Sequence, residues 1–304
     1  MRRLYAFIRL GRPLFLVGGV ILHLLGVAIA FYSGAPLNIA ALLWGQIAIT
    51  ATQWMTHYCN DYFDLEADRV NQTPTNWSGG SRVLTQELLP ARIALFTALM
   101  LACITIIATV VLSVVVQTGV LTLPLLLLAL FLAWFYSAPP LRLHSSGFGE
   151  LSTAVLVGGL TPLTGFYLQS GRLELLPFLA IVPVICLQFC MLLAVSFPDV
   201  LGDGTIGKRT LAVRLGSARA AQLYSFMLLM AYLSLPLLVI VGLPPLVALA
   251  TALLSPLTLW LLWRVRRGDH SNPARWNQLA FVSIALLFST ALVEMLSFAL
   301  LAGM

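Results

Sequence analysis

Charged side chains are scarce in this sequence of 304 residues. Asp, Glu, Lys and Arg together make up 9% of it, whereas hydrophobic residues make up 60%. Soluble domains carry a charge on about a quarter of their residues. The composition and the mean hydropathy of +0.96 therefore exclude a soluble domain of this length. We expect an integral membrane protein.

Cysteine and histidine are also few, and neither has the spacing of a metal site. The four cysteines lie inside or at the ends of apolar runs without a CxxC pair, and the four histidines are scattered over separate segments. Cys186 and Cys190 share a helix face, but buried thiols of this kind are usually core residues. The basic start MRRLYAFIRLGRP lacks a small-residue cleavage site, so we expect no removable signal peptide.

Apolar stretches of roughly 20 residues, the length that a helix needs to cross a bilayer, recur along the whole chain. We predict an all-α membrane protein of nine transmembrane helices in a single domain, residues 1–304. The predicted spans cover residues 14–33, 37–59, 92–115, 119–138, 151–169, 175–198, 219–241, 245–265 and 277–302.

The basic residues indicate how these spans are oriented. With nine spans, the N-terminus and the loops after spans two, four, six and eight share one side, which holds all of the 17 basic residues except Arg172. The positive-inside rule makes that side cytoplasmic and places the C-terminus outside. The net charge of +6 then reflects topology, and we expect no nucleic-acid partner.

Acidic residues gather directly after the second predicted span, in the segment NDYFDLEADRV, residues 60–70. On a continuous helix, Asn60, Asp61, Asp64 and Asp68 would fall within an arc of about 100°. Like charges on one face repel one another, so this arrangement would destabilise a helix end unless a cation lay among them. A solvated acidic loop is the alternative interpretation.

A second acidic segment follows the sixth predicted span on the same side of the membrane. In SFPDVLGDGTIGKRTLAVRLG, residues 196–216, Asp199 and Asp203 are again four residues apart. Carboxylate oxygens suit Mg²⁺, which prefers a few carboxylates together with waters and phosphate oxygens. Basic residues close to both segments, Lys208, Arg209 and Arg82, favour a phosphorylated substrate, because carboxylates alone would repel it.

The two acidic motifs, NDxxDxxxD and DxxxD, resemble those of the UbiA superfamily of membrane-embedded prenyltransferases. The stretches GGSRVLTQELL (79–89), FYSAPPLRLHSSGFGEL (135–151) and GKRTLAVRLG (207–216) are similar to further segments of that family, in the same order. The resemblance runs from about Arg12 to Gly216. It implies a helical bundle around a central cavity that binds a prenyl diphosphate through Mg²⁺.

Site residues follow from this resemblance position by position. The implied metal ligands are Asn60, Asp61, Asp64, Asp68, Asp199 and Asp203, of which Asp64, Asp68, Asp199 and Asp203 are expected to be essential for catalysis. The implied diphosphate contacts are Arg82, Arg142, Lys208 and Arg209. Aromatic faces could shield a prenyl carbocation, and we expect Tyr62 and Tyr136 in the prenyl and acceptor pocket.

The combined motifs are most similar to the 1,4-dihydroxy-2-naphthoate prenyltransferase branch, which couples prenylation to decarboxylation in menaquinone biosynthesis. This implies an aromatic acceptor and a prokaryotic plasma membrane with the active site facing the cytoplasm. Alternative acceptors within the superfamily are 4-hydroxybenzoate, homogentisate, a chlorophyll-type ring or a glycerol phosphate, and a terpene cyclase uses none.

A transporter is the alternative from another functional class. Glu294, Gln53 and Gln188 lie within predicted spans and would form its pathway. Glu294 has apolar neighbours on both sides in the last span, and the enzyme interpretation gives it no role.

Overall fold

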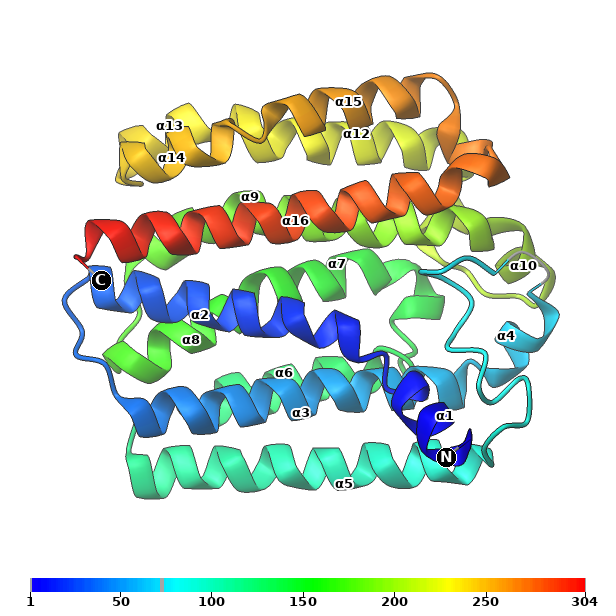
Figure 1. Ribbon diagram of the computed structural model, residues 1–304, viewed down its shortest axis with the longest axis horizontal. Coiled ribbons are helices and arrows are strands. Elements are labelled where there is room, and N and C mark those ends of the chain that lie inside the picture. The colour runs from blue at the N-terminus through cyan, green and yellow to red at the C-terminus, as the bar shows by residue number, and fades with distance from the viewer. Residues whose placement is uncertain (1, 72–73, 304) are drawn as a thin grey trace.

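Helices form all the regular structure of residues 2–71 and 74–303, which are the residues that the computed structural model describes. Long helices lie side by side with their axes roughly parallel or antiparallel (Figure 1). This arrangement confirms the all-α class.

Most of the elements are joined by short connections, but α4 and α5 are 20 residues apart. The first part of the chain contains α1 (Arg2–Leu10), η1 (Pro13–Phe15), α2 (Leu16–Tyr32), α3 (Ile39–Phe63), α4 (Leu65–Val70), α5 (Ala91–Val110), η2 (Val111–Val116) and α6 (Thr122–Phe135). The middle contains η3 (His144–Phe148), α7 (Gly149–Thr153), η4 (Ala154–Leu160), α8 (Thr161–Ser170), α9 (Leu175–Ser196), η5 (Phe197–Asp199), α10 (Val200–Thr205) and α11 (Leu211–Leu215). The last part contains α12 (Ser217–Leu233), α13 (Leu235–Val241), α14 (Pro245–Ala252), α15 (Ser255–Arg266), η6 (Asp269–Ser271) and α16 (Pro273–Leu301).

Six helical segments of the described chain are long and apolar enough to cross a membrane: Arg3–Tyr32, Ala91–Val116, His144–Ser170, Leu175–Thr205, Ser217–Val241 and Pro273–Leu301. Each contains most of one predicted span. A seventh is added if α14 and α15, which meet at a bend of 44°, count as one span. The two remaining predictions coincide with α3, which is long but carries many polar residues, and with α6, which has only 14 residues.

Capping side chains fix where two of these helices begin. The Asn38 side chain accepts a hydrogen bond from the Ala41 amide (3.0 Å) at the start of α3, and Asn272 accepts one from Ala274 (3.1 Å) before α16. Such bonds satisfy backbone donors that the first helical turn leaves without partners.

Glycines bring α2 and α8 into close contact across the bundle. A Cβ atom on Gly26 would lie 1.9 Å from the Pro162 carbonyl oxygen, and one on Gly165 would lie 2.3 Å from the His23 carbonyl oxygen. Because real side chains do not approach so closely, only glycine allows the two backbones to touch here. Small residues at such crossings are typical of membrane helix pairs.

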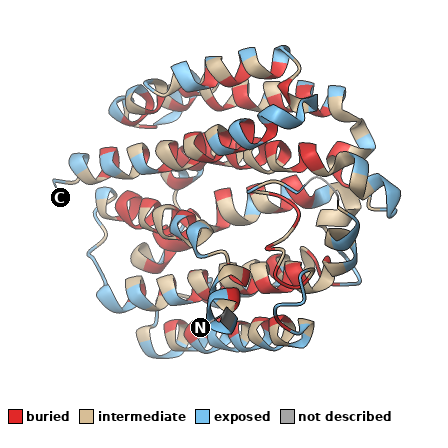
Figure 2. Ribbon diagram, turned by 45° about the vertical axis from the view of Figure 1, so that its right-hand side comes forward, coloured by how far each residue is buried: buried red, intermediate tan, exposed pale blue. Residues whose placement is uncertain are grey.

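The burial pattern suits a lipid environment. Buried side chains line the faces that helices turn toward one another, while the outer surfaces carry exposed residues (Figure 2). Many of the exposed residues are large and apolar, such as Phe96 and Ile107 on α5 and Leu259 on α15. Water would disfavour this surface, whereas hydrocarbon chains would cover it at little cost.

Candidate active site

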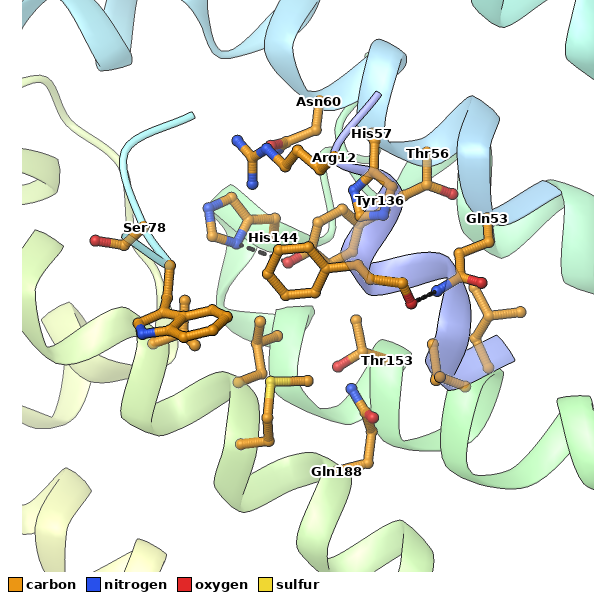
Figure 3. A pocket seen from close by; sticks show the side chains of 18 of the residues that line it. Arg12, Gln53, Thr56, His57, Asn60, Ser78, Tyr136, His144, Thr153 and Gln188 are labelled. Carbon is orange, nitrogen blue, oxygen red and sulfur yellow. Dashed lines mark hydrogen bonds between the residues drawn. The ribbon is translucent and has the colours of Figure 1, made fainter. Parts of the chain in front are cut away.

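A cavity of about 250 Å³ lies at the end of the bundle where α3 and α9 meet α4 and α10. Its wall combines residues of α2, α3, α4, α6, α9, α10 and α16. The loop at residues 77–80 and the helical segment from η3 to α8 also contribute. Figure 3 shows Arg12, His57 and Asn60 on one side of this pocket and Thr153 and Gln188 on the other. Residues distant in sequence therefore share one chamber.

The first acidic segment contributes three of its predicted residues to this wall. Asn60, Asp64 and Asp68 all line the cavity, and the Asn60 side-chain amide donates to Asp64 Oδ2 (2.7 Å) and Ser137 Oγ (3.1 Å). The chain bends at Asp64, where α3 has ended and α4 has not begun. Because of this bend, Asp68 stays beside the cavity rather than continuing along the axis of α3.

The loop after α4 packs directly on this segment. Gly80 has φ +72°, and a Cβ there would lie 2.0 Å from Asp68 Oδ2, so glycine is required both by the backbone and by the space. The Arg82 guanidinium donates to the Asp68 carbonyl oxygen. These contacts explain why the segment GGSR follows the first motif.

The second acidic segment faces the first across the cavity. Asp199 and Asp203 line the wall, and Asp199 Oδ1 accepts hydrogen bonds from Asn71 Nδ2 (2.9 Å) and Ser78 Oγ (3.1 Å). Two residues that follow the first motif thus orient a carboxylate of the second. The sequence prediction that both motifs reach one place agrees with this geometry.

Lys208 lies between the two motifs. Its Nζ atom is 3.1 Å from Asp64 Oδ1 and 3.9 Å from Asp203 Oδ1, and the three side chains are between 10% and 12% exposed. Burial lowers the pKa of Lys208, but the facing carboxylates outweigh this effect and raise it above its ordinary value. The carboxylates therefore stabilise the charged form of Lys208 in a largely buried position.

Negative charge nevertheless dominates the cavity. Burial, followed by repulsion from Asp61 and Asp64, raises the pKa of Asp68 to about 7. A cation bound beside Asp68 would lower this pKa and favour the ionised carboxylate. The wall thus has the electrostatic character of a cation site.

Asp61 does not line this cavity, although it belongs to the same motif. It is 3% exposed, it forms an ion pair with Arg12 Nη2 (2.9 Å), and it accepts hydrogen bonds from the Ser81 amide and hydroxyl. Its oxygens are thus committed to a structural contact between α3, the residue before η1 and the loop before α5. Asp61 therefore lies behind the cavity wall, close enough to Asp68 to repel its charge but not in the lining.

Three of the predicted diphosphate contacts also lie off the cavity wall. Arg142 and Arg209 are exposed, and Arg82 reaches the backbone of Asp68 from outside the cavity. The backbone of Arg209 does contribute, because its amide donates to the Ser145 carbonyl (2.9 Å) and joins the second motif to η3. Lys208 is the predicted basic residue that the structure places on the wall.

The two predicted aromatic residues differ in the same way. Tyr136 lines the cavity, with its hydroxyl oxygen 3.3 Å from His144 Nδ1 and its ring stacked on that imidazole at 5.2 Å. Tyr62 instead packs edge-on against Phe63 in the hydrophobic core, with ring centroids 5.0 Å apart.

Several polar residues on the wall were not predicted as site residues. Gln53 Oε1, His57 Nε2 and Gln188 Oε1 are buried and have no hydrogen-bond partner within the described residues. Buried polar atoms are usually paired in proteins, so unpaired ones on a cavity wall are candidates for ligand contacts. From the sequence, Gln53 and Gln188 were considered only as polar residues within spans that could form a transport pathway.

Glu294 lies apart from this cavity, fully buried among α14 and α16, where its carboxylate accepts a hydrogen bond from Thr251 Oγ1 (3.3 Å). A transport pathway through Gln53, Gln188 and Glu294 would need one continuous chamber. The wall contains the two glutamines and not Glu294.

The donor chemistry of the wall suits Mg²⁺. Within residues 2–71 and 74–303, no three Asp, Glu, His or Cys side chains converge closely enough to surround one ion on their own. Mg²⁺ usually binds through one or two carboxylates, with waters and substrate phosphate oxygens completing its shell. Two facing pairs of aspartates fit this mode better than a closed protein cage.

Comparisons with known proteins agree with the geometry. The model of the UbiA prenyltransferase family matches residues 20–299. A 1,4-dihydroxy-2-naphthoate octaprenyltransferase from Bacillus subtilis (strain 168) is 26% identical over 240 residues, which cover 77% of this chain and 73% of that relative. The enzyme of the same name from Mycobacterium tuberculosis (strain ATCC 25618 / H37Rv) is 34% identical over 99 residues, covering 33% of this chain and 34% of that relative.

Solved structures share the fold at low sequence identity. An apo UbiA homologue from Aeropyrum pernix K1 has a TM-score of 0.70 at 16% identity, over 91% of this chain and 97% of that one. A UbiA homologue from Archaeoglobus fulgidus, solved with DMAPP and Mg²⁺, has a TM-score of 0.63 at 15% identity, over 95% of this chain and 98% of that one. At these identities the likeness concerns the fold.

Proposed function

We propose, from the premise that this chain belongs to the UbiA prenyltransferase family, that it transfers a polyprenyl group from a prenyl diphosphate to 1,4-dihydroxy-2-naphthoate. The chain is a prenyltransferase with apolar helices suited to a membrane. The identity of the acceptor, the metal and the site residues are our proposals.

The observation that carries the proposal is the meeting of the two acidic motifs at one cavity through Lys208. A site with four aspartates and a buried lysine can accept both a divalent cation and a diphosphate. Neither motif alone would provide both charges. We therefore assign Asp64, Asp68, Asp199 and Asp203, assisted by Asn60, to the metal, and Lys208 to the diphosphate.

Mg²⁺ bound there would neutralise the charge that develops on the departing diphosphate. Lys208 would donate to the diphosphate oxygens, and it can change partner because carboxylates and phosphates are both acceptors. The dry wall strengthens these interactions and keeps water from the allylic cation. Tyr136 contributes an aromatic face toward the same space.

The acceptor is assigned from the relatives and from the polar side of the wall. Both named relatives carry 1,4-dihydroxy-2-naphthoate in their names. Gln53, His57 and Gln188 offer unpaired polar atoms that could contact the hydroxyl and carboxylate groups of such a ring. In the reaction, the allylic carbon–oxygen bond breaks, a carbon–carbon bond forms at the ring carbon that bears the carboxylate, and diphosphate and CO₂ leave.

Product analysis tests this assignment. We would incubate the purified chain in detergent with Mg²⁺, a mixture of prenyl diphosphates and 1,4-dihydroxy-2-naphthoate, and examine the products by mass spectrometry. The expected product has gained one prenyl group and lost CO₂. Transfer to 4-hydroxybenzoate, homogentisate or a glycerol phosphate instead would refute this acceptor while keeping the prenyltransferase.

We also propose that all nine predicted spans cross the membrane as one domain of residues 1–304, with the N-terminus and the cavity on the cytoplasmic side of a prokaryotic plasma membrane. The positions of α3 and α6 between longer apolar helices support this count.

Cysteine labelling tests the orientation. In a background that lacks exposed Cys103, a cysteine at exposed Ser271 should react with a membrane-impermeant maleimide only after the cytoplasmic side is opened. A cysteine at exposed Arg172 should react in intact cells. The opposite pattern would overturn the topology.

A further inference from the structure

A second hollow, of about 710 Å³, lies on the surface between α1, α4 and the start of α5. It shares none of its lining residues with the cavity described above. We call it the arginine groove, after the three arginines that line it, Arg3, Arg69 and Arg92. The proposed catalytic chemistry gives it no role.

Positive charge in the arginine groove is poorly compensated. Within the described residues, Arg3 and Arg92 form no ion pair, and Arg69 pairs only with Glu66 (2.9 Å), a side chain that is 84% exposed. Glu87 is the single acidic residue of the lining. An exposed pair of this kind contributes little energy, so Arg69 can readily turn to another anion.

The N-terminus of α5 adds to this charge. The helix has 20 residues, it begins at the groove after Pro90, and its first turn has neither an acidic residue nor a side-chain cap. Its first amide groups therefore leave a partial positive charge beside the arginines.

An apolar track leads away from the groove along α5. Phe96, Leu99 and Met100 follow Arg92 by four, seven and eight residues, so all four lie on one face of the helix. These apolar side chains are 64%, 48% and 51% exposed. The Arg92 guanidinium therefore lies next to an exposed apolar surface that a hydrocarbon chain could cover.

Helix α1 closes the other side of the groove and also favours contact with lipid. Its side chains Leu4, Tyr5 and Ile8 are exposed, while Ala6 and Leu10 are buried. Arg9 ties the helix to the protein by donating to the Ser81 carbonyl oxygen (3.1 Å). Such a short amphipathic helix can rest at the boundary between headgroups and acyl chains.

We propose that the arginine groove binds an anionic phospholipid, with its phosphate among Arg3, Arg69 and Arg92 and an acyl chain along Phe96, Leu99 and Met100. Basic pockets at the membrane surface are suited to anionic headgroups. A soluble phosphate would use the arginines and leave the apolar track without a function.

Native mass spectrometry of the full chain in a neutral detergent tests this site. We would titrate dioleoylphosphatidylglycerol against dioleoylphosphatidylcholine and compare the groove variant R3Q/R69Q/R92Q with the control R219Q/R266Q/R275Q. The control removes the same charge from exposed arginines elsewhere on the protein. Each arginine that contacts a bound headgroup should change the binding of that lipid by a factor of roughly five, whereas arginines outside the groove should not.

The groove variant should therefore bind phosphatidylglycerol on the order of 100-fold more weakly, while the control should stay within about twofold of the native chain. Unchanged binding by the groove variant, or an equal loss in the control, would overturn the site. Glycerol 3-phosphate that competes as well as the lipid would identify a soluble phosphate site instead and refute the lipid. If the triple variant fails to fold, R92Q alone should show a loss of roughly fivefold.

Discussion

Replacing Asp203 by alanine should lower kcat/KM for prenyl transfer by about 1000-fold, with folded protein recovered. The substitution removes one of the carboxylates that face Lys208 and the first motif across the cavity. Loss of one preorganised electrostatic contact to a leaving group typically costs on the order of 100- to 1000-fold. We place Asp203 at the upper end because a metal contact would be lost with it. Initial rates of product formation, followed by mass spectrometry, would measure the effect.

Glu66→Ala is the matched control for this substitution. Glu66 lies in the first acidic segment, but its side chain is 84% exposed and, among the residues that the structure describes, forms an ion pair only with Arg69. We expect its kcat/KM to stay within about twofold of the native value, as for most exposed substitutions away from a site. If Asp203→Ala retained native activity, the assignment of the second motif to the metal would be wrong.

Removal of Mg²⁺ should abolish transfer, and restoring the ion should recover it. The facing aspartates repel one another and the diphosphate, and Lys208 together with Arg12, which is paired with Asp61, cannot balance the site. Activity would be measured in excess EDTA, and again after Mg²⁺ has been added beyond the chelator. EDTA saturated with Mg²⁺ beforehand controls for effects of the chelator itself, and full activity in free EDTA would contradict the proposed metal.

A comparison of two Asn variants then tests which aspartates hold the ion. Asp199→Asn should raise the Mg²⁺ concentration for half-maximal activity by at least about tenfold, since even changes around metal ligands cost that much in affinity. Asp61→Asn should leave this concentration within about twofold, because Asp61 does not itself line the cavity and its oxygens are held by Arg12 and Ser81. An equal shift in both variants would restore Asp61 to the metal set.

Composition and periodicity were sufficient to predict much of the fold. The scarcity of charge and the length of the apolar runs predicted long membrane helices, and six helical segments have the expected length and apolarity. The bend between α14 and α15 was not predicted, because residues 245–265 were taken as one apolar span although Pro256 lies in the first turn of α15, directly after the break. The crossing at Gly26 was also not predicted, since it depends on a partner helix more than 130 residues away.

Local spacing was less reliable within the candidate site. The prediction for Asp61 assumed one continuous helix through Asp68, whereas the chain bends at Asp64. Asp61 forms an ion pair with Arg12, which lies 49 residues earlier in the chain. No local pattern in the sequence predicts this pair. Lys208 was found from its closeness in sequence to the second motif.

The family resemblance also implied diphosphate contacts at Arg142 and Arg209, whose side chains lie on the surface. Side-chain direction in a loop depends on the turn, and Arg142 has a left-handed backbone with φ +44°. The unpaired polar atoms of Gln53, His57 and Gln188 could be recognised only after α3 and α9 had been placed around one chamber.

The ties among Arg9, Arg12, Asp61 and Ser81 have a practical consequence for purification. They join the N-terminal helix to the glycine loop that packs on Asp68. We expect an affinity tag fused before α1 to disturb these contacts. In contrast, α16 ends at the opposite end of the bundle (Figure 1). An affinity tag should therefore be placed after α16, because binding to a resin there would not disturb the end of the bundle that contains the cavity.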